Sequence, residues 1–367
     1  MHLMQLQIQN FRNLLKVDFE PVDGVNLITG LNASGKTSLL EAIYYLSHLR
    51  SFRTHQITDL INRQATQLQL VARIHENPDH QIPLGIQRSR NKLEVRANRQ
   101  PVKRVADIAT LFPVLAIHPD SYKLITGGPS YRRQYLDWGV FHVEHSFFNI
   151  WQRYKRALMQ RNAALKSRQN DEYCSLWDRE LYEMATQIDR LRGHYLENLQ
   201  PYLNTLIQQF FSDQDVELSY RRGWSEESEL NQLFKSELHR DRMKGFTQYG
   251  PHRAELTIKV NGQSAQTGIS RGQQKTLVAL LRLAQGSCLT LGVDNLPLCG
   301  VHPVLGELGA DGTDILKNLL QGISEGVNPT LPALQGDLDL GVVSFISVHV
   351  NSPFIVAGLS PRLVLAG

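Results

Sequence analysis

Four residues near the N-terminus have the types and the spacing of a phosphate-binding loop. Gly30, Gly35, Lys36 and Thr37 fit the pattern G-x-x-x-x-G-K-[ST] within the stretch ITGLNASGKTSLL. Glycines let the backbone curl until successive N–H groups point at phosphate oxygens. In this pattern the lysine reaches the β- and γ-phosphates, and the threonine hydroxyl binds Mg²⁺. The pattern therefore predicts a site for a nucleoside triphosphate, with Thr37 as the metal ligand.

The segments on both sides of this loop support the prediction. The preceding run GVNLI is short and apolar, which is typical of a buried strand. In the following segment TSLLEAIYYLSHL, the apolar residues recur at helical spacing. The N-terminus of a helix adds a partial positive charge to an anion site. The order strand, loop, helix argues against a glycine-containing turn that fits the pattern by chance.

A second motif, ISRGQQKTLVALLRLAQG at residues 269–286, also predicts an anion site. Ser270, Gly272 and Gln273 open a predicted helix, and serine is a good N-cap. A hydroxyl beside the free N–H groups of a helix start can bind a phosphate. A second phosphate site in one protomer is redundant unless it faces the nucleotide of a neighbouring copy. The motif thus predicts a protein that dimerises around ATP.

The composition excludes several classes of protein. The chain of 367 residues is long enough for two domains, and 42% apolar with 20% charged residues is an ordinary globular mixture. No segment approaches the roughly 20 apolar residues that span a bilayer, so we expect no membrane association. The N-terminal segment alternates like a strand and does not resemble a signal peptide. The three cysteines form no C-x-x-C pair, which favours a cytoplasmic location without a structural zinc.

Charge is unevenly distributed along the chain. The net charge is +4, but residues 286–367 hold two bases against seven acids, which leaves +9 on residues 1–285. A basic front segment indicates a polyanionic partner such as nucleic acid.

The order of predicted elements indicates an α/β fold with a helical insertion. Residues 1–115 read as strands around one helix, residues 130–211 follow a helical period with two long antiparallel helices, and strands return later. We expect the first part of a head domain at 1–118, a helical lobe at 119–245 and the second part of the head at 246–367.

Five segments of this chain resemble the RecF family, a bacterial branch of the ABC/SMC-like ATPases. They are LQIQNFRNL, GLNASGKTSLLEAIYYLSHLRSFRT, GGPSYRRQYLD, YGPHRAEL and ISRGQQK, and they span residues 3–290. Their order and spacing are more specific than any one motif. The resemblance implies an ABC-type P-loop ATPase head with an inserted, mainly helical second lobe.

The resemblance also implies a function in DNA replication, recombinational repair and the SOS response. Proteins of this family bind ATP and DNA, dimerise with ATP, and act with RecO and RecR to load recombinase at gapped DNA. Carried over by position, the nucleotide and Mg²⁺ are held by Gly30, Leu31, Asn32, Ala33, Ser34, Gly35, Lys36, Thr37 and Ser38. The γ-phosphate of the partner's nucleotide is contacted by Ser270, Gly272 and Gln273.

Three pairs of basic residues are candidates for DNA contact. They are Arg50 and Arg53 after the first helix, Lys103 and Arg104 past a turn, and Arg132 and Arg133 at the start of the helical lobe. Basic side chains on phosphates give affinity without reading sequence. The alternatives are a solvated surface or, for Arg132 and Arg133, an ion pair with Asp137.

The acids that such an ATPase needs for hydrolysis do not stand where the resemblance places them. One carboxylate should hold Mg²⁺ and the next should orient the attacking water. The ELG at Glu307 stands where the family has an ELD-like turn. Counting back from it places His302 and Pro303 at the positions of the two acids. Asp294 is a competing candidate for one of these acids. Neither histidine nor proline can do this work, so the catalytic residues are unknown. A switch histidine is also unclear, with His349 as the candidate.

The tail from residue 291 to 367 departs from the family in composition. It is rich in glycine and proline and poor in charge. One explanation is a divergent lobe that binds ATP and hydrolyses it poorly. The other is an altered reading frame or a degenerate gene, which leaves the last strands of the head unspecified; low charge with scattered glycine and proline favours this one.

Three other functions are alternatives to a RecF-type ATPase. A nucleotide-gated DNA-binding clamp without ATPase activity agrees with the missing acids. A GTPase or phosphoryl-transfer enzyme would not need ISRGQQK and should carry an N-K-x-D-like motif, which is absent. A transporter ATPase subunit does not explain the helical insertion.

Overall fold

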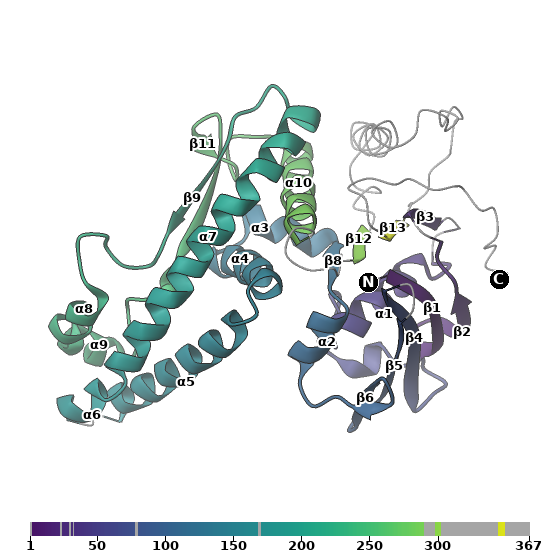
Figure 1. Ribbon diagram of the computed structural model, residues 1–367, viewed down its shortest axis with the longest axis horizontal. Coiled ribbons are helices and arrows are strands. Elements are labelled where there is room, and N and C mark those ends of the chain that lie inside the picture. Colours follow the sequence, from purple (N-terminus) through teal and green to yellow (C-terminus); the bar gives the residue numbers. More distant parts are fainter. Residues whose placement is uncertain are drawn as a thin grey trace. The chain divides into compact units, whose positions relative to one another are not determined.

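The computed structural model describes residues 2–22, 24–28, 31, 33–77, 80–167, 170–289, 298–301 and 344–348. The chain divides into two compact units, each considered by itself (Figure 1). The first unit contains residues 1–122 and 271–367, and the second contains residues 123–270. The division expected from the sequence put 246–270 with the head, whereas the structure groups these residues with the helical unit.

Within the described residues, the first unit contains two sheets and three helices. Its elements are β1 (His2–Phe11), β2 (Leu14–Phe19), β3 (Gly24–Ile28), α1 (Lys36–His48), β4 (Gln67–Asn77), β5 (His80–Ser89), β6 (Leu93–Ala97), β7 (Gln100–Pro101), α2 (Val105–Leu111), β8 (Val114–Ile117), α10 (Arg271–Leu289), β12 (Leu298–Val301) and β13 (Ser344–Val348). Short 3-10 turns lie at η1 (Ile57–Asp59) and η2 (Pro119–Tyr122). The strand expected at the N-terminus is confirmed as β1, and Asn98 and Arg99, in the turn between β6 and β7, have positive φ.

The larger sheet and α1 form the core of the first unit. The sheet has six strands in the order β2-β1-β4-β5-β6-β7, with antiparallel neighbours. Its strands alternate, so that one face is buried, as at Leu6, Ile8, Leu68 and Leu70. Helix α1 is buried along nearly its whole length, from Lys36 to Ser47 with one exception at Thr37. A helix enclosed in this way cannot shift without disturbing the core.

The smaller sheet contains the strand that enters the phosphate-binding loop. Its four strands lie in the order β3-β13-β12-β8. Strand β12 runs parallel to β8, with Val301 opposite Ile117, and β13 runs antiparallel to both β12 and β3.

The second unit is mainly helical, as the resemblance implied. Its elements are α3 (Lys123–Thr126), α4 (Pro129–Val143), α5 (Phe147–Lys166), α6 (Asp171–Ser175), α7 (Asp178–Phe210), β9 (Val216–Arg221), α8 (Leu230–Ser236), α9 (Leu238–Lys244), η3 (Pro251–Arg253), β10 (Glu255–Val260) and β11 (Gln263–Ser264). Strand β10 pairs with β9 over its whole length and with β11. This pairing explains why the residues after 246 belong to the second unit.

Two long helices, α5 and α7, lie side by side in the second unit (Figure 1). The apolar stripe expected on α7 is buried, including Leu181, Met184 and Ile188. Helix α4 packs against α7 through Gly139, where a Cβ atom would lie 2.1 Å from the Tyr195 ring. Any larger residue at 139 would therefore push α4 away from α7.

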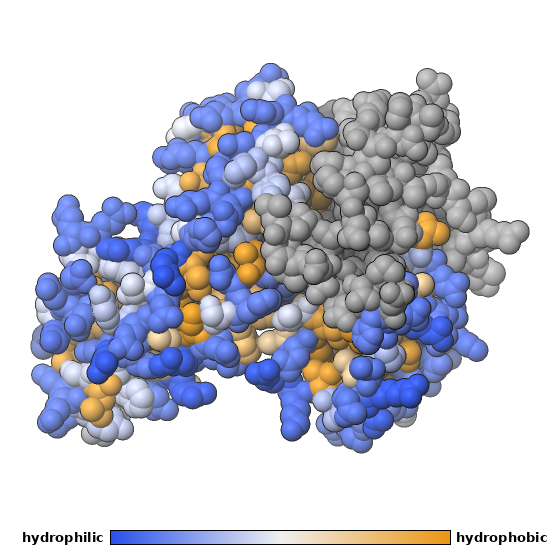
Figure 2. All heavy atoms as spheres, viewed as in Figure 1, coloured by the Kyte–Doolittle hydropathy of each residue, from blue (hydrophilic) through white to orange (hydrophobic). Residues whose placement is uncertain are grey.

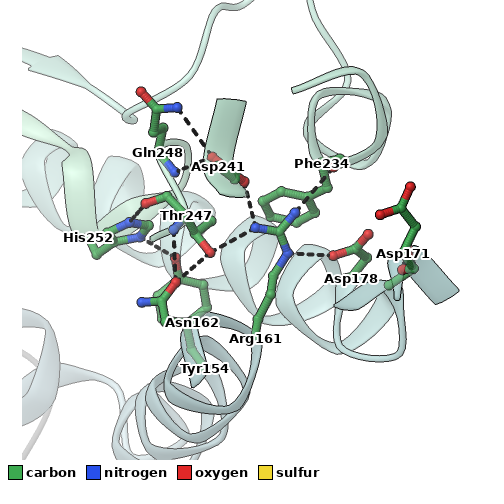
Figure 3. A network of polar contacts seen from close by, with 11 residues as sticks. Tyr154, Arg161, Asn162, Asp171, Asp178, Phe234, Asp241, Thr247, Gln248 and His252 are labelled. Carbon is green, nitrogen blue, oxygen red and sulfur yellow. Dashed lines mark hydrogen bonds and ion pairs between the residues drawn. The ribbon is translucent and has the colours of Figure 1, made fainter. Parts of the chain in front are cut away.

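A buried arginine connects three segments of the second unit (Figure 3). The Arg161 side chain on α5 is fully buried, and its Nε donates to Asp178 Oδ1 at 2.8 Å. Its Nη1 donates to Asp241 Oδ2 at 2.6 Å and to Thr247 Oγ1 at 2.9 Å. Burial raises the pKa of Asp178, and the Arg161 charge opposes this effect. Arg161 thereby joins α5, the start of α7 and the end of α9.

The segment YGPHRAEL is held in place by the same group of contacts (Figure 3). His252 lies 3.0 Å from the Thr247 carbonyl through Nε2 and 2.6 Å from the Tyr154 hydroxyl through Nδ1. These partners suit the neutral ring, and burial lowers the pKa of His252 to about 4. Buried Arg192 on α7 donates to the Pro251 carbonyl at 2.9 Å. The segment is thus bonded through polar contacts to α5, to α7 and to the loop at Thr247.

Hydrophilic residues cover most of the visible surface of both units (Figure 2). Within the described ranges, no helix is both long and apolar enough to cross a bilayer. Cys174 and Cys288 are buried cysteines outside any disulfide of the described residues, and burial raises the pKa of Cys288 to about 11.

Replacing Arg161 with methionine should strongly destabilise the protein. Asp178 and Asp241 would keep their buried positions without a countercharge, and such a change lowers the free energy of unfolding by about 3–5 kcal/mol. Urea unfolding at neutral pH measures the loss. The control is Arg179→Met, since Arg179 is 90% exposed and pairs with Glu183 on one helix face; we expect a loss below about 1 kcal/mol. Equal losses in the two variants would contradict the role of Arg161.

Candidate nucleotide-binding site

The phosphate-binding loop joins β3 to α1, as the sequence pattern predicted. Leu31 and residues 33–35 are described, whereas Gly30 and Asn32 lie outside the described residues. Gly35 has φ +103° and immediately precedes the helix. A Cβ atom at this position would lie 2.6 Å from Leu14 Cδ2, so both the backbone conformation and the available space require glycine. The loop therefore turns sharply into the N-terminus of α1.

Lys36 is the first residue of α1 and is only 4% exposed. Its Nζ donates to the Leu31 carbonyl at 2.7 Å, so the ammonium group lies across the loop. No acidic residue occupies the first turn of α1. The helix N-terminus and the lysine charge together favour a bound anion.

Two hydroxyl groups of the loop are suited to a phosphate and its metal. The Ser34 hydroxyl is buried, and no described residue hydrogen-bonds to it. A buried hydroxyl without a partner is costly, so a phosphate oxygen is a fitting acceptor. Thr37 is half-buried on the first turn of α1, at the position where the pattern expects the Mg²⁺ ligand. The residues present thus fit a nucleotide polyphosphate with its metal.

The second motif opens α10, as expected. Helix α10 begins at Arg271, so Ser270 stands directly before it and Gly272 and Gln273 lie in its first turn. The next residue, Gln274, is 3% exposed and accepts a hydrogen bond from the Tyr122 hydroxyl. Gln274 was not predicted, because a glutamine in a polar motif gives no sign of being buried.

A buried carboxylate supports the segment that follows α1. Glu41 on α1 is fully buried and accepts hydrogen bonds from Arg12 and from the Ser51 hydroxyl. Arg53 Nη1 lies 3.7 Å from the same carboxylate and its side chain is 47% exposed. The Phe52 ring stacks on His118 at 4.9 Å. Arg50, which is exposed, and Arg53 therefore lie on a segment with a fixed shape.

The other basic candidates fall into two groups. Lys103 is exposed, and Arg104 is 63% exposed beside Asp107. Arg132 is only 15% exposed and forms an ion pair of 2.7 Å with Glu255. Arg133 donates to the Ala254 carbonyl at 2.8 Å, and burial lowers its pKa.

The ion-pair alternative for Arg132 and Arg133 named the wrong partner. Asp137 pairs with Arg192 at 2.7 Å. Arg132 finds its partner on β10, which no spacing within α4 could indicate.

The structure places the strand that should precede the catalytic acids. Strand β12 ends at Val301, directly before His302 and Pro303. His302, Pro303, Asp294 and His349 lie outside the described residues. Within the described ranges there is no group of three His, Cys, Asp or Glu side chains that could hold a metal ion.

Comparisons with known proteins agree with this architecture. Residues 2–326 match the family model of the RecF/RecN/SMC N terminal domain. The DNA replication and repair protein RecF of Thioalkalivibrio sulfidiphilus is 40% identical over 338 residues, which cover 92% of this chain and 93% of the relative. RecF of Aliivibrio salmonicida is 40% identical over 322 residues, which cover 88% and 90%.

Solved structures show the same fold. The recombination mediator protein RecF with ATP, from the RecFOR pathway, superposes with a TM-score of 0.77 at 28% identity, over 87% of this chain and 89% of that chain. An Smc head domain from Pyrococcus furiosus superposes with a TM-score of 0.55 at 13% identity, over 88% and 86%, which supports the ABC-type ATPase head fold alone. On the family model and these relatives together, the chain belongs to the RecF family of DNA replication and repair proteins.

Proposed function

We propose that this chain binds ATP with Mg²⁺, dimerises when ATP is bound, and binds DNA during recombinational repair. The observation that carries the proposal is the loop geometry, in which left-handed Gly35 leads directly into buried Lys36 at the N-terminus of α1. The ATP in the related RecF structure supports the choice of nucleotide.

In this proposal residues 30–38 surround the polyphosphate. Lys36 exchanges the Leu31 carbonyl for the β- and γ-phosphate oxygens. The Ser34 hydroxyl, which has no hydrogen-bond partner among the described residues, donates to the phosphate. Thr37 holds Mg²⁺, which when bound neutralises part of the phosphate charge. The partly positive helix N-terminus stabilises the remaining charge.

ATP-dependent dimerisation uses the start of α10. Ser270, Gly272 and Gln273 contact the γ-phosphate bound by the other copy, because a helix start with a hydroxyl is an anion site. ADP lacks the γ-phosphate, so the dimer depends on ATP.

The DNA partner is single-stranded DNA and the junction of duplex with single strand at gaps. The +9 charge on residues 1–285 supports a polyanionic partner. Arg50, Arg53, Lys103 and Arg104 are the exposed candidates for phosphate contact. Arg132 and Arg133 stay weaker candidates, since both already bond within the second unit.

The biological role proposed is loading of recombinase together with RecO and RecR in the bacterial cytoplasm, including the SOS response. The relatives support it, since they include a DNA replication and repair protein and a recombination mediator of the RecFOR pathway.

A second function is a nucleotide-gated DNA clamp without ATPase activity. The sequence observation that favours it is the pair His302 and Pro303, directly after β12, where two acids are expected. Both functions share ATP binding and differ in ATP turnover.

Replacing Lys36 with alanine should remove most of the ATP affinity. Charged hydrogen bonds to a phosphate contribute about 1.5–3 kcal/mol each, so the dissociation constant should rise roughly 10- to 100-fold. Titration calorimetry with ATP and Mg²⁺ measures it. Lys16→Ala is the matched control, because Lys16 is exposed on β2 and should leave the affinity unchanged. Equal affinities of Lys36→Ala and wild type would rule out this loop as the site.

Replacing Arg50 and Lys103 together with alanine should weaken binding to gapped DNA regardless of its sequence. Each lost phosphate contact should lower the salt dependence of log K by about one unit. Fluorescence anisotropy at several salt concentrations measures both quantities. Arg179→Ala removes an exposed charge from α7 and should change neither. An unchanged salt slope in the double variant would exclude Arg50 and Lys103 as contacts.

A further inference from the structure

The turn between β1 and β2 contacts the phosphate-binding loop through one side chain. Asn13 Nδ2 donates to the Ala33 carbonyl at 3.0 Å. Asn13 Oδ1 accepts a hydrogen bond from the Ser38 hydroxyl at 2.7 Å. The two ends of one amide group therefore hold the middle of the loop and the first turn of α1.

The turn itself is held firmly from the opposite side. Asn10 and Arg12 both have positive φ, at +57° and +52°. The backbone N–H of Arg12 donates to the Leu60 carbonyl at 2.7 Å, and the N–H of Asn62 donates to the Asn10 carbonyl at 2.8 Å. The Asn62 side chain donates to the Arg12 carbonyl at 2.6 Å. The guanidinium of Arg12 in turn binds buried Glu41 on α1.

The loop needs such support. Ala33 has φ +67°, a conformation that residues with a Cβ rarely adopt, and Gly35 follows at φ +103°. Glycine adopts a positive φ without steric cost, so the strain lies at Ala33, and this residue favours other conformations unless the loop is supported. The bond from Asn13 to the Ala33 carbonyl fixes the strained peptide directly.

Asn13 contributes little to the hydrophobic core, because its side chain is exposed on the surface of the turn. Neighbouring Leu14 is 4% exposed and fills the space beside Gly35. Asn13 is exposed, and both polar atoms of its amide bond to the loop and to the start of α1. Its contribution is therefore to the shape of the loop, and its contribution to the stability of the fold is small.

We propose that Asn13 is a positioning residue that keeps the phosphate-binding loop in its binding shape before the nucleotide arrives. Preorganisation of a loop raises affinity by reducing the ordering that binding requires. The proposal rests on the proposed binding of ATP at this loop and adds the residue that holds it. In this proposal the segment LQIQNFRNL supports the phosphate-binding loop through Asn13.

Two substitutions at residue 13 test the proposal. Asn13→Ala removes both bonds, and ATP affinity should fall about 10-fold. Asn13→Asp keeps an acceptor for Ser38 but places a carboxylate against the Ala33 carbonyl, so its loss should be at least as large. In Ser38→Ala the loss should be smaller, and the double variant with Asn13→Ala should lose less than the product of the single losses, because the two residues share a bond.

Three readouts separate positioning from a general loss of structure. They are the ATP dissociation constant, the melting midpoint without nucleotide, and amide hydrogen exchange of residues 33–38 without nucleotide. The control Asn62→Ala removes the side-chain bond to the Arg12 carbonyl but keeps the two backbone bonds that hold the turn. It should therefore lower the melting midpoint while changing ATP affinity less than 3-fold. For Asn13→Ala we expect weaker affinity, faster exchange in the loop and a nearly unchanged midpoint.

Several results would overturn the proposal. Unchanged affinity in Asn13→Ala and Asn13→Asp would do so, as would a loss matched by Asn62→Ala. If wild-type protein binds no ATP, the proposed function fails, and hydrogen exchange still decides on Asn13. Faster exchange at 33–38 in Asn13→Ala then supports its hold on the loop, and unchanged exchange refutes it.

Discussion

The left-handed backbone at Gly35 is the constraint on which the arrangement of the site depends. It turns the chain from the loop into α1 within one residue, and Leu14 leaves no room for a side chain there. Because α1 is buried almost throughout, the position of Lys36 is fixed by the core of the first unit. The turn at Asn10–Asn13 and the carboxylate of Glu41 connect this helix to the six-stranded sheet. The anion site is therefore a direct consequence of how the core is packed.

The second unit is organised around buried arginines. Arg161 joins α5, α7 and α9, and Arg192 joins α7 to α4 and to the segment YGPHRAEL. Buried charges tolerate little displacement, since an unpaired partner would remain without solvent. Within the first unit, the bond from Tyr122 to Gln274 connects the residue where the chain leaves for the second unit with the start of α10. The start of α10, which carries the second motif, is thus bonded to Tyr122, the last residue before the second unit.

Local patterns predicted the elements that depend on local physics. The glycine spacing indicated the loop, the alternation of Leu6 and Ile8 indicated a buried sheet face, and the stripe on α7 indicated its packing. Contacts between distant segments could not be read from spacing. Arg132 pairs with Glu255 instead of Asp137, Asn13 reaches Ala33, and β10 joins β9 in the second unit. Each of these contacts joins residues that are far apart in the sequence. The periodicity of a single sequence predicts helices and strands but not such contacts. The absence of the catalytic acids from the aligned positions stays a prediction, because His302 and Pro303 lie outside the described residues.

If the loop at α1 binds ATP and the γ-phosphate brings two copies together, the oligomeric state must follow the nucleotide. It is measured by the sedimentation coefficient of the protein with ATP and Mg²⁺, with ADP and Mg²⁺, and without nucleotide. We expect a dimer with ATP alone and the same slower species in the other two conditions. We also expect Ser270→Arg to abolish the dimer without weakening ATP binding. Identical sedimentation in all three conditions would refute ATP-dependent dimerisation.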